Sequence, residues 1–344
     1  HARTYRAAMV TALPHRATAC RYCGAVVRCG MIGRVPSPGF RTERLFPNGL
    51  DPRCAQPSHR VRKRQGGRRQ DVHISQFCRP ERGRGWHTLF IEFDAQGDAG
   101  DDLGYKHTPD NDRGAHMLEV LDAHQPLKPV LREIRPNLDV IPMGRDALKD
   151  IEDVLLGKER RGTEYRLMLA EALAPLARDY DLIVIDTPPT RPIILQLVLG
   201  ATRWVVVPTK SDRSSIGNLA ELAAELTEVR QANPHVEVLG VVPFDFDTSG
   251  ARIRRNAVED INAVLDGASS LFLDQEGEVI TIRHSSAAVD ARNAGKLVHE
   301  LAEIAKEEEA GEPWWKALRE GRRRERIPGS VGGLADDHLL LTNA

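Results

Sequence analysis

At positions 89–97 the chain reads Leu-Phe-Ile-Glu-Phe-Asp-Ala-Gln-Gly, and at positions 180–189 it reads Tyr-Asp-Leu-Ile-Val-Ile-Asp-Thr-Pro-Pro. These two stretches decide the fold, because each is a short apolar run that ends in an aspartate and then a turn. A buried strand of a parallel sheet delivers a carboxylate to the carboxyl edge of the sheet in this way, and open α/β folds bind ligands at that edge. We therefore expect Asp94 and Asp186 to lie side by side at the rim of a ligand site.

Strand and helix patterns alternate from Thr88 onward, which predicts an α/β domain with a doubly wound, mainly parallel sheet and helices on both faces. We expect strands at 88–94, 138–142, 181–186, 203–208 and 236–243. We expect helices at about 145–158, 163–177, 191–200, 214–232, 250–266 and 294–309.

Composition divides the chain near Trp86. Residues 1–86 hold 18 of the 48 basic residues, 4 of the 49 acidic residues and all five cysteines, so they carry a net charge of +14 against −15 for the rest. We predict three segments: a basic, Cys-containing and irregular segment at 1–86, an α/β domain at 87–309, and a short helix with a flexible tail at 310–344. The sequence contains no apolar run of the ~20 residues that a membrane span needs, so we expect a cytoplasmic protein.

The two aspartate stretches together resemble the ParA family of partition ATPases, the deviant Walker-A group that also contains MinD. The resemblance runs from about Thr88 to Ala305 and implies a P-loop NTPase-like fold. It implies that Asp186 is the Walker-B aspartate, which holds the hydration shell of Mg²⁺, and that Asp94 orients the attacking water within a D-x-Q-G switch segment. Taken alone, an aspartate after an apolar strand is more often a helix cap or a turn former.

The resemblance adds further site residues. It implies that Gln96, Gly97, Pro188 and Pro243 lie at the bound ATP, with Pro243 near the adenine; Ala95 departs from the family, which commonly has proline there. Residues 248–255 and 282–285 resemble segments whose basic side chains contact DNA non-specifically. This makes Arg252, Arg254, Arg255 and Arg283 candidate phosphate contacts, although for any single arginine a solvated helix face is the slightly favoured explanation.

The resemblance fails upstream, where the family has its lysine-rich phosphate loop. Three interpretations of residues 1–86 remain open. They form a basic arm for nucleic acid, or a zinc site with Cys20, Cys23, Cys29 and either Cys54 or His15, or a segment translated out of frame. For the third, codons read one nucleotide later allow residues 64–72 to become G-K-G-G-V-G-K-T-S, the deviant Walker-A loop, about 20 residues before Asp94.

The leading functional hypothesis is therefore a ParA-like ATPase that segregates a chromosome or a plasmid. The resemblance implies ATP and Mg²⁺ as cofactors, an ATP-dependent homodimer, non-specific DNA, a ParB-like DNA-binding partner and a place at the nucleoid. A MinD-like membrane role is disfavoured, because the polar face of 294–309 is rich in Glu and poor in cations.

The alternative is a non-enzymatic remnant or binding module. Without a phosphate loop the charge-assisted bonds to the triphosphate are lost, so we expect little or no ATP hydrolysis from the chain as written. A zinc-containing DNA-binding fusion with a silent ATPase-like domain is a third hypothesis.

Overall fold

The computed structural model describes residues 7–12, 87–187, 191–210, 213–246, 255–256, 258–259, 261–263, 271–274, 277–310 and 330–343. Within them one sheet has the strand order β3-β4-β2-β5-β1-β6-β7-β8. The strands are β1 Ala7–Ala12, β2 Thr88–Glu92, β3 Leu131–Arg135, β4 Leu138–Ile141, β5 Leu182–Thr187, β6 Trp204–Thr209, β7 Glu237–Phe246 and β8 Ile282–Arg283.

Most of the sheet is parallel. β2 pairs in parallel with β4 and β5, β6 with β7, and β7 with β8. β1 runs antiparallel to both β5 and β6, and β3 runs antiparallel to β4. Six strands therefore share one direction, and their carboxyl ends meet at one edge.

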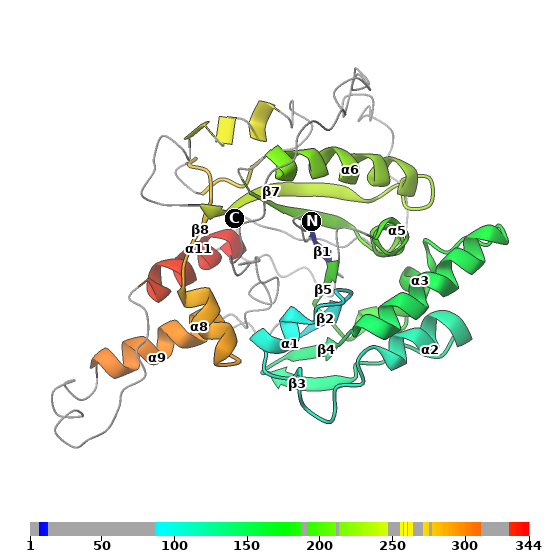
Figure 1. Cartoon of the computed structure of the whole chain (residues 1–344), viewed down its shortest axis with the longest axis horizontal. Coiled ribbons are helices and arrows are strands. Elements are labelled where there is room, and N and C mark those ends of the chain that lie inside the picture. Colours follow the sequence, from blue (N-terminus) through cyan, green and yellow to red (C-terminus); the bar gives the residue numbers. More distant parts are fainter. Residues whose placement is uncertain are drawn as a thin grey trace, which may run out of the picture.

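Helices cover both faces of this sheet (Figure 1). One face packs against α2 Ala115–Ala123, α3 Arg145–Arg160, α4 Met168–Leu173, α5 Pro192–Gly200 and α6 Arg213–Val229. The other packs against α1 Asp98–Asp102, α8 Ala287–Asn293, α9 Val298–Ala310 and α11 Val331–Asn343. Alternation along the strands sorts the side chains, so Leu89 and Ile91 face the first group and Phe90 faces the second.

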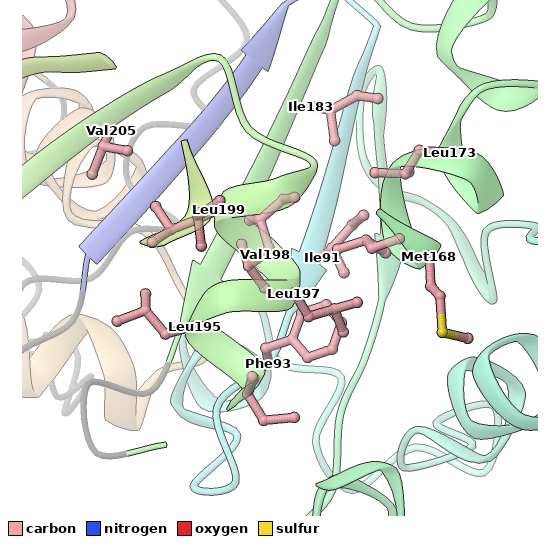
Figure 2. Close-up of a cluster of buried hydrophobic side chains, with 14 of the residues drawn as sticks. Ile91, Phe93, Met168, Leu173, Ile183, Leu195, Leu197, Val198, Leu199 and Val205 are labelled. Atoms are coloured by element: carbon pink, nitrogen blue, oxygen red, sulfur yellow. The ribbon is translucent and has the colours of Figure 1, made fainter. Parts of the chain in front are cut away.

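The core of the first face is built around α5. This helix begins with Pro192 in its first turn, where a missing backbone N–H costs nothing. Its sequence Pro-Ile-Ile-Leu-Gln-Leu-Val-Leu-Gly is apolar except at Gln196, as expected of a helix whose residues 193–200 are all buried. Figure 2 shows Leu195, Leu197, Val198 and Leu199 of α5 gathered near Ile91 and Phe93 of the β2 segment.

The predicted α/β fold with a mainly parallel sheet is confirmed, and the five predicted strands are present with ends that differ by at most three residues. The helix expected over 163–177 is wrong in extent. It is α4 followed by a separate 3-10 turn, Leu176–Arg178, because Pro175 lacks the N–H that would continue α4. The helix expected over 294–309 starts four residues later, after Gly295 adopts φ 61°.

The segments outside the predicted domain also differ from expectation. The flexible tail expected over 328–344 is wrong for Val331–Asn343, which form α11 and bury Val331 and Leu334. Ala7–Ala12 form a strand inside a segment expected to be irregular. Within the described residues no helix is long and apolar enough to cross a membrane.

Candidate functional site

The two aspartates lie at the carboxyl ends of neighbouring parallel strands. Glu92 of β2 is the register partner of Asp186 of β5, and the backbone N–H of Phe93 donates to the carbonyl of Asp186 at 2.8 Å. Asp94 follows two residues beyond Glu92. Since strand side chains alternate, Glu92 and Asp186 project to the same face as Phe90 and Val184, the face covered by α1 and α8.

The D-x-Q-G segment is a closed turn. One carboxylate oxygen of Asp94 accepts from the Gln96 N–H at 2.9 Å, and the Asp94 carbonyl accepts from the Gly97 N–H at 3.3 Å. Gly97 has φ 63°, a left-handed conformation that favours glycine, and from it the chain enters α1. The turn holds Asp94 almost fully buried at the edge of the sheet.

Glu92 is a third carboxylate of this edge that the sequence reasoning missed. Its two oxygens accept from the Ala99 N–H at 3.2 Å and from the Tyr105 hydroxyl at 2.9 Å. Strand alternation could have identified Glu92, because residues two apart on a strand share a face and Glu92 lies two residues before Asp94.

Tyr105 is buried beside this acidic edge, with its hydroxyl on the carboxylate of Glu92. Burial raises the pKa of its phenol well above the ordinary value, and Glu92 adds to the rise through its charge and its hydrogen bond. The charges of Asp186 and Asp102 raise the pKa of Tyr105 further.

The site is strongly acidic. Five carboxylates here are between 1% and 7% exposed: Glu92, Asp94, Asp98, Asp102 and Asp186. A single arginine from α8 reaches two of them. Arg292 donates from Nε to Asp102 at 3.1 Å, and its Nη1 lies 3.6 Å from Asp98. These contacts tie the C-terminal helices to α1, directly after the switch segment.

The chemistry of this edge fits the metal half of a nucleotide site. Mg²⁺ prefers oxygen ligands and usually keeps several waters, with one or two carboxylates and substrate phosphates completing its shell. Among the described residues no group of three or more His, Cys, Asp or Glu side chains is placed to hold a metal ion. The carboxylate of Asp186 is an oxygen ligand of the kind that such a shell uses.

The phosphate half does not fit in the same way. A triphosphate needs a run of backbone N–H groups and a lysine, usually in a loop that follows a strand at the carboxyl edge. β1 is the neighbour of β5 in the sheet but runs antiparallel to it. Ala7 pairs with Thr187 at the carboxyl edge of the parallel strands, and Ala12 pairs with Leu182 at the opposite edge. The chain therefore leaves β1 at the edge away from Asp94 and Asp186.

The other predicted residues are placed unevenly. Pro243 is buried at the carboxyl end of β7, beside Thr209 of β6. Arg255 is exposed and helical. Arg283 of β8 donates to both carboxylate oxygens of Asp337 at 2.7 Å, so its guanidinium is engaged by α11. Several predicted positions lie outside the described residues: Pro188, Arg252, Arg254 and the candidate zinc ligands His15, Cys20, Cys23, Cys29 and Cys54.

Comparisons with known proteins show which family and which relatives the chain resembles. The family described as "AAA domain" matches residues 76–238. The chain is 34% identical over 200 residues to the chromosome partitioning protein ParA of Myxococcus xanthus, covering 57% of this chain and 65% of that protein. It is 29% identical over 164 residues to the maintenance of carboxysome distribution protein A of Synechococcus elongatus, covering 47% and 61%. The chain thus spans less than two thirds of the length of either relative.

A solved structure supports the fold. The ATP complex of a McdA variant from Cyanothece superposes with a TM-score of 0.51 at 20% identity, over 71% of this chain and 88% of that one. At this identity the likeness concerns the arrangement of strands and helices.

Proposed function

Because the chain belongs to the ParA/MinD family of ATPases, we propose that it is a ParA-type partitioning protein that segregates a chromosome or a plasmid. It acts through ATP-gated homodimerisation and non-specific DNA binding. A ParB-like DNA-binding protein is the expected partner, and the nucleoid in the cytoplasm is the expected location.

The observation that carries this proposal is the pairing of β2 with β5, which sets Asp94 and Asp186 at one rim. In a phosphoryl-transfer site the protein supplies charge neutralisation and a positioned water. Asp186 would hold the hydration shell of Mg²⁺, and Asp94 would orient the attacking water. Bound Mg²⁺-ATP would supply the phosphoryl group and the metal's positive charge.

The DNA-binding side rests on fewer described residues. Arg255 is exposed and able to reach a phosphate, whereas Arg283 would first have to leave the carboxylate of Asp337. We therefore expect Arg255 to contribute more than Arg283 to DNA affinity. Such contacts release counterions, so binding should weaken steeply as salt rises.

A second candidate, a non-enzymatic binding module, is favoured by the direction of β1. A loop that directly follows this strand starts at the wrong edge to cradle phosphates beside Asp186. For the chain as written we therefore expect little or no ATP hydrolysis. The out-of-frame interpretation reconciles both candidates, since a shifted frame would restore a phosphate loop to an otherwise intact scaffold.

The test begins with the coding DNA between the codons for Arg60 and Thr88. A frame-corrected chain is then made, in which residues 64–72 read G-K-G-G-V-G-K-T-S and the present frame resumes before Thr88. Steady-state ATP hydrolysis is measured for the chain as written, for the frame-corrected chain, and for the Asp186→Asn variant of each.

Of the chains compared, we expect only the frame-corrected chain with Asp186 intact to hydrolyse ATP. We expect DNA and a ParB-like partner together to stimulate that hydrolysis. Hydrolysis by the chain as written, abolished by Asp186→Asn, would instead show that no upstream loop is needed. A frame-corrected chain that folds but neither binds nor hydrolyses ATP would contradict the proposed function.

A further inference from the structure

A lysine outside the D-x-Q-G motif holds that segment in place. The Lys106 ammonium donates to the carbonyl of Gln96 at 3.0 Å and to the carboxylate of Asp101 at 2.7 Å. Its own backbone N–H donates to the Gly100 carbonyl at 3.1 Å. Lys106 therefore joins the switch turn to the last residues of α1, and no sequence motif pointed to it.

The close approach of Lys106 depends on a glycine. A Cβ on Gly100 would lie 3.0 Å from Cβ and 3.2 Å from Cα of Lys106, and 3.2 Å from the Tyr105 ring. A side chain at this position would push Tyr105 and Lys106 outward by a few tenths of an ångström, so glycine favours the close return of the chain after α1. Because the chain turns back after α1, Tyr105 and Lys106 lie against the segment that runs from Glu92 to Gly97.

The two neighbours anchor different points of that segment. Tyr105 is fully buried and holds the carboxylate of Glu92, at the end of β2. Lys106 is 32% exposed and holds the carbonyl of Gln96, two residues beyond Asp94. One anchor fixes the strand and the other fixes the turn, so the backbone at Asp94 is held on both sides, and the Gln96 N–H orients its carboxylate.

We propose that Lys106 is a positioning residue, which orients the Asp94–Gly97 turn for the chemistry at Asp94. Its effect on turnover rests on the proposed function, whereas its effect on the turn does not. A purely structural role would be small, because a partly exposed Lys–Asp pair contributes little to stability. A charge-assisted hydrogen bond to a backbone carbonyl, in contrast, restricts the local geometry directly.

The first experiment is amide hydrogen exchange on the full chain without nucleotide. Lys106→Met removes the ammonium and keeps most of the stem, Lys106→Arg keeps a cationic donor, and Lys149→Met removes an exposed lysine of α3 as the matched control. In Lys106→Met we expect the amides of Gln96 and Gly97 to exchange at least about tenfold faster, with the unfolding midpoint unchanged. In Lys106→Arg and Lys149→Met they should stay within about threefold of the parent.

The second experiment uses the frame-corrected chain. Lys106→Met should lower kcat about tenfold with KM changed less than about threefold, because the turn orients water and does not bind the bulk of the nucleotide. Lys106→Arg should restore most of kcat.

Unchanged exchange in Lys106→Met, or equally fast exchange in Lys106→Arg, would overturn the assignment. If the frame-corrected chain shows no hydrolysis at all, the proposed function fails, while the exchange data still decide whether Lys106 positions the turn.

Discussion

Replacing Arg292 by methionine removes the cation that links α8 to α1. Counting side-chain atoms alone, Arg292 is 21% exposed, Asp102 is 2% exposed and Asp98 is 11% exposed. Removing one member of a buried ion pair costs about 3–5 kcal/mol, and an exposed pair costs about 0–1 kcal/mol. The two carboxylates are nearly buried and the arginine is partly exposed, so the cost should lie between these limits. We expect Arg292→Met to lower the free energy of unfolding by about 2–3 kcal/mol.

The assay is urea unfolding followed by circular dichroism, with a double-mutant cycle. Asp102→Asn keeps the shape of the side chain and removes its charge, so the double variant should lose about 1–3 kcal/mol less than the sum of the single variants. Arg255→Met, the loss of an exposed helical arginine, serves as the control and should change stability by less than about 0.5 kcal/mol. Additive losses, or an Arg292→Met loss no larger than that of the control, would refute the reasoning.

Two further predictions concern the scaffold. Burial lowers the pKa of His116 from its ordinary 6.5, and the charge of Lys128 acts in the same direction. The folded protein therefore favours the neutral imidazole. The contribution of this ring to stability is fully present above pH 6.5 and is lost as the pH falls below it. Urea unfolding at pH 7.5 and 5.5 should therefore show a smaller loss in His116→Gln than in the parent, and equal losses would contradict this assignment. A Cβ on Gly200 would lie 1.8 Å from the Arg166 carbonyl, whereas one on Gly157 would meet only a side-chain nitrogen at 3.6 Å. Gly200→Ala should lower the free energy of unfolding by about 2 kcal/mol or more and Gly157→Ala should raise it by about 0.5–1 kcal/mol, so changes of the same sign would argue against this packing.

The strands that carry the site were predictable because each is a short apolar run that ends in an aspartate. β2 and β5 bury side chains on both faces, and such runs stand out in a sequence whatever surrounds them. α1 was not predictable, since its sequence Asp-Ala-Gly-Asp-Asp has weak helix propensity and forms one short turn held by contacts to Glu92 and Arg292.

Helix α11 was not predicted because its first turn contains two glycines. Gly332 and Gly333 suggest a loop, yet a Cβ on Gly333 would lie 2.5 Å from the Arg283 guanidinium. At Gly333 glycine therefore serves close packing and not flexibility. Arg292 and Asp102 are 190 residues apart in sequence, and Lys106 belongs to no motif, so only the folded chain brings them to the site.

The most direct measurement of the central claim is a crystal structure of the frame-corrected chain with Mg²⁺ and a non-hydrolysable ATP analogue. We expect the terminal phosphate at the shared edge of β2 and β5, with Asp186 reaching the metal through water and Asp94 facing the phosphorus. Nucleotide bound at another edge, or carboxyl groups of these two residues on opposite sides of the sheet, would contradict it.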